Sequence, residues 1–345
     1  MKPTISVVIV TYNSEAYISQ CIQSVLKQHN PNLEVIVIDN HSTDRTIQIL
    51  ENEFSTSITF ISLKKNVGFA EANNVAVEKA GGEFLFLLNP DTELSDNFFS
   101  PLIQAMKKNT QIGACQPLVY LMNNRNVINL TGKVPQFLGF DWIRDFQEKE
   151  SPKEGKILSI SGSGVLLRSL MIKEIGLFDP AYFMYYEDSD LSWRMNLAGY
   201  DCVFVPQSIM FHDYKLVPNG RSQTSKNKLF YAERNRVLNV LKNYSFKSLM
   251  LILPLFFVFE LLLIFFACIS GFGKEKIRTY LSIWKLRAHI MQARKQVQVL
   301  RKRSDRNIVS KFSGPILFKP FLNIIVEYIV NPFISAYWTV ARIFI

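Results

Sequence analysis

The sequence lacks the patterns that mark disulfide-rich domains, zinc proteins and two common nucleotide-binding sites. Its four cysteines, Cys21, Cys115, Cys202 and Cys268, are scattered over 345 residues and form no Cys-x-x-Cys pair. This argues against a disulfide framework or a zinc site and favours a reducing compartment. Neither Gly-x-Gly-x-x-Gly nor Gly-x-x-x-x-Gly-Lys-Ser/Thr occurs, so neither a Rossmann dinucleotide site nor a P-loop is supported.

The N-terminus also lacks the pattern of a signal peptide. "MKPTISVVIVTYN" contains a short apolar run, but no small-residue cleavage pattern follows it. We therefore interpret this run as a first buried strand.

Acidic residues are scarce in one region near the C-terminus. Residues 274–311 hold twelve Lys or Arg against Glu275 and Asp305, a surplus equal to the net charge of +10 for the whole chain. A nucleic-acid-binding domain would spread its basic residues over a folded surface. A basic block beside apolar segments instead predicts contact with an anionic membrane surface, and no nucleic-acid partner is expected.

Short apolar runs alternate with helix-period segments through the first half of the chain. The expected strands are "ISVVIV" (5–10), "EVIVID" (34–39), "ITFISL" (58–63) and "EFLFLLN" (83–89). Unbroken β-branched runs are typical of parallel strands that are covered on both faces. The pattern predicts an α/β fold with a doubly wound, mostly parallel sheet, which binds ligands at the carboxyl ends of its strands.

Polar residues gather where these four strands end. The clusters are Thr11-Tyr12-Asn13, then Asp39-Asn40-His41-Ser42-Thr43-Asp44, then Asn66-Val67-Gly68 with Asn73 and Asn74, and finally Asn89-Pro90-Asp91-Thr92-Glu93. Each residue alone could be a helix cap or part of a turn. Four clusters at four successive strand ends predict a ligand site.

The rhythm of strands and helices changes after the fourth strand. An insertion from about residue 123 to 155 has the composition of a mobile loop on the substrate side. Further on, "DCVFVPQSIMFHDY" predicts two short strands that end near His212.

The stretch "FMYYEDSDLSWR" (183–194) sets three carboxylates directly after large apolar and aromatic residues. Carboxylates held close together raise one another's pKa, which makes one of them a better general base, and an aromatic wall suits a sugar ring. Glu187 and Asp190 could instead orient the base or bond to Arg194. The alternative is an acidic first turn of a helix, stabilised by the helix dipole.

The character of the chain changes past about Lys247, so we expect one domain over residues 1–245 and a tail over 246–345. "LMLILPLFFVFELLLIFFACISGF" (249–272) carries only Glu260 as a charge and is long enough to span a bilayer. Pro254 and Glu260 leave a re-entrant or interfacial helix open. A seam of apolar residues from Ile283 to Leu300 on a basic helix could pair with a second subunit.

Taken together and in this order, the motifs resemble the family 2 glycosyltransferases, which have the GT-A fold. The subgroup most similar is the rhamnosyltransferase type of cell-surface polysaccharide synthesis. The resemblance covers residues 5 to about 245. It rests on "VVIVTYNSE", "VIDNHSTD", "NVGFAEANN", "LLNPDTEL", "GSGVLLR", "GLFDPAYFMYYEDSDLSWRMNLAGY", His212 and "YAERNR".

The resemblance implies roles for the polar residues at the strand ends. Those expected to bind the nucleotide are Thr11, Tyr12, Asn13, Asp39, Asn40, Asn66, Gly68, Asn74 and Asn89, with Arg234 and Arg236 near the diphosphate. Thr11, Tyr12, Asn13 and Asp39 would hold the base and ribose. Asn89 stands where some relatives have the first acid of an Asp-x-Asp motif, so one carboxylate is present instead of two.

The same resemblance implies the chemistry. Asp91 and His212 would bind a divalent Mg²⁺ or Mn²⁺ ion, and Asp188, with Glu187 and Asp190 beside it, would be the general base. A cation on oxygen ligands compensates charge on a departing diphosphate, and an attacking hydroxyl needs a base within hydrogen-bond reach.

The function expected is therefore an inverting glycosyltransferase at the cytoplasmic face of the cell membrane. It would use a dTDP- or UDP-sugar, such as dTDP-rhamnose, and a glycan or lipid-linked acceptor. Two alternatives stay open: a non-catalytic membrane scaffold with a degenerate transferase domain, and a glycoside hydrolase, which also uses paired carboxylates. Nucleotide binding would separate the transferase from the hydrolase.

Overall fold

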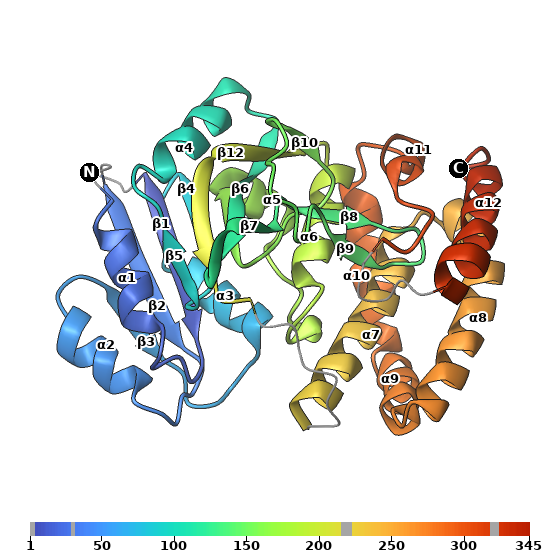
Figure 1. The fold of residues 1–345 in the computed structure, drawn as a ribbon, viewed down its shortest axis with the longest axis horizontal. Helices are drawn as coiled ribbons and strands as arrows, with labels where there is room; N and C mark the ends of the chain where they lie inside the picture. The colour runs from blue at the N-terminus through green and yellow to red at the C-terminus, as the bar shows by residue number, and fades with distance from the viewer. Residues whose placement is uncertain (1–3, 29–31, 215–222, 318–323) are drawn as a thin grey trace. The chain divides into compact units, whose positions relative to one another are not determined.

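The computed structural model describes residues 4–28, 32–214, 223–317 and 324–345. Two compact units make up the chain (Figure 1). The first comprises Met1–Lys133, Ile143–Phe183 and Tyr200–Lys215, and the second comprises Val134–Trp142, Met184–Gly199 and Leu216–Ile345.

A ten-stranded sheet is the frame of the first unit (Figure 1). Its order is β10-β12-β6-β11-β4-β1-β2-β3, and β5 pairs with β12 while β7 pairs with β6. The strands are β1 (Ile5–Thr11), β2 (Leu33–Asp39), β3 (Thr59–Ser62), β4 (Phe84–Leu88), β5 (Thr92–Leu94), β6 (Ile112–Leu121), β7 (Asn124–Leu130), β10 (Gly155–Ile157), β11 (Gly164–Arg168) and β12 (Asp201–His212). A separate pair joins β8 (Lys133–Pro135) to β9 (Asp141–Ile143).

One half of the sheet is parallel. β1 pairs in parallel with β2 and β4, and β2 pairs in parallel with β3. Every residue of β1 is buried, as the unbroken apolar run predicts for a strand covered on both faces. The predicted α/β sheet and its first four strands are confirmed, and the carboxyl ends of these strands meet at one edge.

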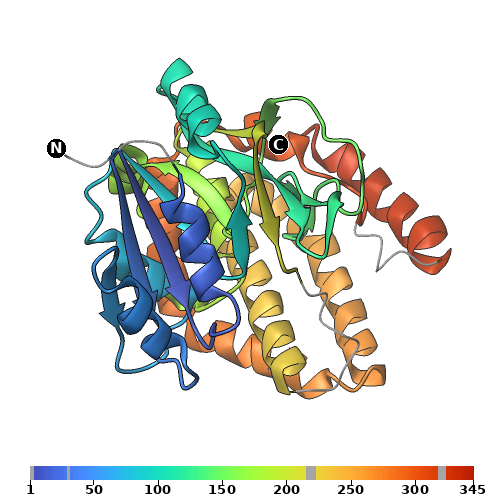
Figure 2. The same ribbon diagram turned by 60° about the vertical axis from the view of Figure 1, so that its left-hand side comes forward.

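Helices cover both faces of this half. They are α1 (Ile18–Leu26), α2 (Thr46–Phe54), α3 (Phe69–Val77), α4 (Phe99–Lys108) and α5 (Ser169–Ile175). One apolar cluster joins Ile5, Val7 and Ile9 of β1 to buried residues of α1, α2 and α4, so these helices lie on one face (Figure 2). α3 also lies against β1 and β2 but shares no residue with that cluster, so it covers the opposite face.

The other half of the sheet is mixed and differs from expectation in two places. Residues 201–212 form the single strand β12, with an irregular register between Val205 and Ile209. Pro206 lies in this interval and has no N–H to donate, so the strand bulges there and does not end. The insertion expected to be a loop contains the strands β7, β8 and β9.

The second unit is helical. Its helices are α6 (Glu187–Leu197), α7 (Gln223–Asn243), α8 (Phe246–Ile269), α9 (Gly273–Lys285), α10 (Arg287–Leu300), α11 (Asp305–Ile308) and α12 (Asn331–Ala341), with a short 3₁₀-helix at Val309–Lys311 and a π-helical segment at Val326–Val330. α8 begins at a capping serine, since the Ser245 hydroxyl accepts a hydrogen bond from the Ser248 N–H at 3.2 Å. The expected domain boundary after residue 245 falls inside this unit, between α7 and α8.

The apolar seam of the basic helix α10 faces its own chain. Ile290, Ala293 and Val297 are buried, and α10 packs on α7. The Arg294 guanidinium donates to the Leu241 carbonyl at 2.6 Å. The seam that could pair with a second subunit is therefore filled by α7.

Candidate functional site

The carboxyl ends of β1 and β2 are joined by side chains that bond to the backbone of the neighbouring loop. Thr11 and Asp39 are buried partners in the parallel register. The Asp39 carboxylate accepts hydrogen bonds from the Ser42 N–H, at 2.9 Å, and from the Ser42 hydroxyl. Asn13 has a left-handed backbone, with φ of 50°, and its side-chain oxygen accepts a hydrogen bond from the Thr43 N–H at 2.8 Å. The two loops therefore hold each other in a fixed conformation.

The third loop is joined to the same edge by Asn40. Its amide donates to the Asn66 side chain at 3.1 Å, and its side-chain oxygen accepts from the Val67 N–H at 2.9 Å. Asn66 in turn accepts from the Gly68 N–H at 2.9 Å. The structure thus brings Thr11, Asn13, Asp39, Asn40, Asn66 and Gly68 into one hydrogen-bonded edge. Tyr12 is half exposed beside them.

Gly68 is required at the start of α3 for two reasons. Its φ is +87°, a conformation that residues with a Cβ rarely adopt. A Cβ placed there would also lie 2.5 Å from the Phe183 carbonyl oxygen. Asn74, further along α3, bonds to the Phe178 backbone through both ends of its amide, at 2.9 and 3.1 Å. Both residues therefore fix the segment that leads into the acidic stretch.

Asp91 and His212 meet because β5 pairs with β12. His212 is the register partner of Thr92, and Asp91 precedes Thr92 directly. The His212 Nε2 atom lies 3.3 Å from the Asp91 Oδ1 atom. Asn89, at the end of β4, is held by the bond from its N–H to the Ser163 carbonyl at 2.9 Å.

The surroundings of this pair suit a cation. The second ring nitrogen of His212, Nδ1, lies 3.0 Å from the Asn129 Oδ1 atom. With that oxygen as acceptor, the ring proton is on Nδ1, and the lone pair of Nε2 points at Asp91. Asp91 Oδ1 is buried and has no hydrogen-bond partner among the described residues. One nitrogen and one carboxylate oxygen therefore face each other and fit a shared divalent ion.

Two protein ligands are a partial set for such an ion. Within the described ranges, no group of three or more His, Cys, Asp or Glu side chains could hold a metal. Mg²⁺ and similar ions commonly keep waters and bind substrate phosphates beside one or two carboxylates. The arrangement therefore fits an ion that arrives with a phosphorylated ligand.

In the second unit, a strained turn leads into the acidic stretch. Tyr185 and Tyr186 both have φ of 68°, which is unusual for bulky side chains. Asn235 of α7 is fully buried, and its amide donates to the carbonyls of Met184 and Tyr185 at 2.9 and 2.7 Å. Strain of this kind persists where the surroundings fix it, and it concentrates at functional sites. Asn235 is one of the groups that fix it here.

The three carboxylates after this turn have different surroundings. All lie in the first turn of α6 and are buried, which agrees with the helix-dipole interpretation. Asp188 accepts from the Ser189 N–H at 2.7 Å, and the Ser189 hydroxyl donates to Asp141 at 2.5 Å. Glu187 lies one residue before, also within the first turn. Asp188 and Glu187 therefore lie beside Asp190 in the same buried turn of α6.

Asp190 is neutralised by buried cations. Its carboxylate lies 2.7 Å from the Arg194 Nε atom, 2.8 Å from the Lys242 Nζ atom and 3.0 Å from the Asn243 amide nitrogen. Burial alone would raise the pKa of Asp190, but Lys242 and Arg194 outweigh it and hold this pKa well below its usual range. Of the alternatives left open by the sequence for Asp190, the structure shows the bond to Arg194. A carboxylate stabilised in this way is a poor proton acceptor, so its role is to join α6 to α7.

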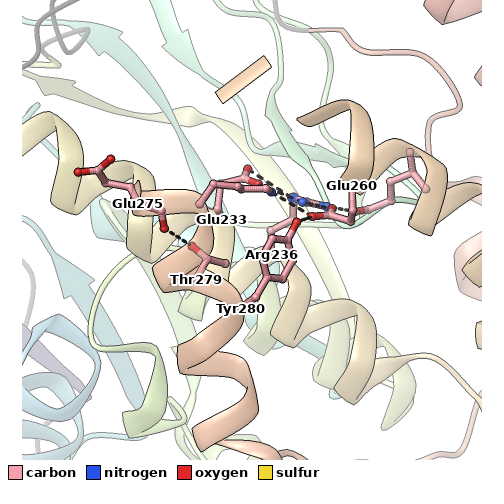
Figure 3. Close-up of polar contacts among 8 residues, drawn as sticks. Glu233, Arg236, Glu260, Glu275, Thr279 and Tyr280 are labelled. Atoms are coloured by element: carbon pink, nitrogen blue, oxygen red, sulfur yellow. Dashed lines mark hydrogen bonds and ion pairs between the residues drawn. The ribbon is translucent and has the colours of Figure 1, made fainter. Parts of the chain in front are cut away.

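The two arginines of α7 also differ. Arg236 is fully buried, and its guanidinium bonds to Glu260, to Glu233 at 3.1 Å and to the Leu138 carbonyl at 2.9 Å (Figure 3). Contact with a diphosphate would require these bonds to break. Arg234 lies beside Asn235, with its Nε 2.9 Å from the Asn235 side-chain oxygen, and its guanidinium stands 5.0 Å from the centre of the Tyr231 ring.

Three residues of these sites have no signal of their own in the sequence. Asn129 orients His212, Asn235 fixes the turn before α6, and Asp141 reaches Asp188 through Ser189. Each comes from a distant part of the chain. Only Asn235 lies in a quoted motif, "YAERNR", where the arginines drew attention first.

The chain has relatives of known function. Residues 6–176 match the family model for glycosyl transferase family 2. The poly-beta-1,6-N-acetyl-D-glucosamine synthase of Staphylococcus epidermidis is 27% identical over 230 residues, which are 66% of this chain and 54% of that protein. This chain thus spans about half the length of that synthase. The N-acetylglucosaminyl-diphospho-decaprenol L-rhamnosyltransferase of Mycobacterium tuberculosis is 27% identical over 249 residues, which are 65% of this chain and 80% of that protein.

A solved structure shares the fold. GalNAc-T7 with UDP, GalNAc and Mn²⁺ matches with a TM-score of 0.60 and 18% identity, covering 73% of this chain and 51% of that one. A likeness at this identity establishes the fold alone, a mixed α/β sheet with helices of the GT-A type. Residues 6–176 therefore form a glycosyl transferase family 2 domain by sequence, and the fold around them is of the GT-A type.

Proposed function

We propose that the protein is an inverting, metal-dependent glycosyltransferase of cell-surface polysaccharide synthesis. It moves a sugar, rhamnose or a similar one, from a dTDP- or UDP-linked donor to a hydroxyl of a glycan or lipid-linked acceptor. The observation that carries this proposal is the Asp91–His212 pair at the carboxyl edge of a GT-A sheet. The Asp91 Oδ1 and His212 Nε2 atoms of this pair lie 3.3 Å apart. The named activities of the relatives support the substrate class.

The nucleotide binds, in this proposal, at the hydrogen-bonded edge of β1, β2 and β3. Asp39, which Ser42 holds, would accept hydrogen bonds from a base or ribose, and the exposed ring of Tyr12 would offer a stacking surface. Asp91 and His212 hold the divalent ion, which when bound supplies positive charge to the diphosphate. The Mn²⁺ in GalNAc-T7 supports this assignment.

Asp188 acts as the general base. The acceptor hydroxyl attacks the anomeric carbon as Asp188 takes its proton, and the bond from that carbon to the diphosphate oxygen breaks, so the configuration inverts. Asp190 leaves this role to Asp188 because its own charge is already neutralised by Arg194 and Lys242. Glu187 and Asp141 lie near enough in the fold to orient the acceptor.

The protein is attached, in this proposal, to the cytoplasmic face of the cell membrane through the tail from residue 246. α8 is apolar, and the basic segment 274–311 favours an anionic surface. Basic flanks tend to stay cytoplasmic, where nucleotide sugars are made. A lipid-linked acceptor would be reached from that side.

A panel of nucleotide sugars tests the proposal. Thermal unfolding of the full-length protein is measured with dTDP-rhamnose, UDP-GlcNAc and GDP-mannose, each with and without Mn²⁺. We expect one donor to raise the unfolding temperature midpoint only when Mn²⁺ is present. In Asp91→Asn, this Mn²⁺-dependent rise should be lost. No shift with any nucleotide sugar in the presence of Mn²⁺ would overturn the proposal.

A further inference from the structure

The helix α8 has two faces that its sequence does not distinguish. Among the described residues it is the one helix long and apolar enough to cross a membrane. One face is buried in the second unit and includes Ile252, Phe256, Phe259 and Glu260. The other face is exposed and includes Phe257, Val258, Leu261, Leu262, Phe265 and Ile269. Apart from Glu260, both faces are apolar, so the difference in exposure arises mainly from packing.

The buried face is tied to the rest of the unit by a charge network. Glu260, near the middle of α8, bonds to Arg236 of α7 and to Tyr280 of α9 (Figure 3). It also accepts a hydrogen bond from the Lys276 ammonium of α9 at 3.0 Å. Glu233 of α7 completes the network through Arg236 and Lys276. Arg236 and Lys276 are balanced by Glu233 and Glu260, so no net charge is buried.

This network is incompatible with α8 crossing a bilayer. A spanning α8 would either carry α7 and α9 into the hydrocarbon or leave Glu260 without its cations. α7 holds Arg234, Asn235 and Lys242 besides Glu233 and Arg236, which is too polar for a membrane interior. Removing one partner from a buried ion pair is strongly destabilising. The helix is therefore held along the surface of its unit.

The neighbouring helix α9 continues the exposed apolar character. Ile277, Leu281 and Trp284 follow at intervals of four and three residues and are all exposed. The Arg287 guanidinium lies 4.7 Å from the centre of the Trp284 ring. Tryptophan beside arginine is typical of a membrane–water interface.

Most basic residues of segment 274–311 are exposed as well. They are Lys274, Arg278, Lys285, Arg287, Lys295, Lys302, Arg306 and Lys311. Each basic residue near an anionic surface adds to the attraction, while the apolar residues enter the headgroup boundary.

We propose that the exposed faces of α8 and α9 form a monotopic docking surface for an anionic lipid bilayer, with α8 lying in the interface and not spanning it. The inference rests on the proposed membrane attachment and specifies its form. It also has a consequence for the acceptor: Asp188 and this surface belong to the same compact unit. A base in the membrane-docked unit suits a lipid-linked acceptor.

A second copy of the chain is a less favourable occupant of this surface. A two-fold partner would bring an equal surplus of positive charge to the same place, and like charges repel. The α10 seam is also filled by α7 and so is not available for pairing. An anionic bilayer complements both the apolar and the basic features.

Flotation with vesicles tests the surface. Full-length protein is mixed with two kinds of preformed vesicle. One is phosphatidylcholine alone, and the other is phosphatidylcholine that contains about 30% of the anionic lipid phosphatidylglycerol. We expect flotation with the anionic vesicles and a loss of binding of about tenfold or more for Leu261→Lys, because a side chain that enters the interface becomes charged. Leu170→Lys, on α5 of the first unit, makes the same change at another exposed leucine and should bind as the parent does.

Thiol labelling tests the orientation of α8. Cys268 is exposed and the other three cysteines are buried, so Lys274→Cys in a Cys268→Ser background carries one accessible thiol just beyond α8. With the protein bound outside sealed vesicles, a membrane-impermeant maleimide should modify this thiol fully before detergent is added. Protection until detergent is added would show that α8 spans the bilayer and would overturn the proposal.

Two further results separate this proposal from its alternatives. If Leu261→Lys floats as well as the parent, the surface does not bind lipid. If the parent is a dimer without lipid and Leu261→Lys is a monomer, the surface is a dimer interface. Nucleotide-sugar binding is measured on the same variant by thermal unfolding. Retained binding with lost flotation supports the docking surface independently, whereas lost nucleotide binding in the parent would count against the proposed function alone.

Discussion

The two units hold their polar residues in different ways. In the first unit, the side chains at the strand ends bond to the backbone of neighbouring loops, as Asp39 does to Ser42 and Asn40 to Val67. In the second, buried charges neutralise one another between helices, as Asp190 does with Lys242 and Arg236 with Glu260. The first arrangement forms a sheet edge where a ligand can bind. The second joins neighbouring helices and so supports the residues beside Asp190 and Arg236.

The largest effect on activity is expected when Asp91, a proposed ligand of the divalent ion, is removed from the first unit. Asp91→Ala removes the carboxylate oxygen that faces His212 Nε2, so the diphosphate loses its compensating charge. We expect turnover to fall below detection while the far-ultraviolet circular dichroism stays unchanged. Product formation from a labelled nucleotide sugar measures this. Full activity of the parent in excess EDTA would remove the metal from the mechanism.

The largest effect on stability is expected in the second unit. Asp190→Asn removes the buried negative charge that faces Lys242 and Arg194, at a cost of about 3–5 kcal/mol in the free energy of unfolding. Urea unfolding measures this. Glu51→Gln on the exposed surface of α2 is the control and should change the free energy by less than about 0.5 kcal/mol. Equal effects of the two changes would mean that the Asp190 pairs contribute nothing.

The pH dependence of the same pairs has a definite sign. The pKa of Asp190 is lower in the folded protein than in the unfolded chain, because Lys242 and Arg194 outweigh the effect of burial. Its contribution is therefore present above the unfolded pKa of about 4 and is lost as the pH falls below it. Acid unfolding of the parent should consequently be steeper than that of Asp190→Asn.

The candidate base comes next in size. Asp188→Asn is nearly isosteric but accepts no proton, so we expect the turnover rate to fall at least ~100-fold. Donor binding should be almost unchanged, because the residues assigned to the nucleotide belong to the first unit. Steady-state rates and calorimetric titration of the donor measure the two quantities. A loss of only a few-fold would move the role to Glu187.

The same contrast explains what the sequence could predict. The strands β1 to β4 were predictable because buried parallel strands are unbroken apolar runs, and the strand ends then locate the polar clusters. The meeting of Asp91 with His212 depends on β5 pairing with β12, which has no local signal. The two faces of α8 were not predictable because both are apolar, and the partners of Glu260 lie on other helices.

A smaller effect on activity is expected from replacing Asn235, a buried residue of the second unit that bonds to the backbone of a neighbouring turn. It is buried on α7 beside Arg234, and its amide holds the carbonyls of Met184 and Tyr185 in the turn before Asp188. Asn235→Ala leaves both carbonyls without this donor and lets Tyr185 relax from its left-handed backbone, so the base is held less well. We expect kcat to fall about tenfold with KM for the donor unchanged.

Asn239→Ala is the matched control for Asn235→Ala, since it removes another buried amide from the same helix, one turn later. If both variants lose the same fraction of kcat and the same unfolding free energy, Asn235 contributes only general stability. If Asn235→Ala alone lowers kcat, the turn that it holds is a functional element, because its strain is then maintained for catalysis and not as an incidental result of packing.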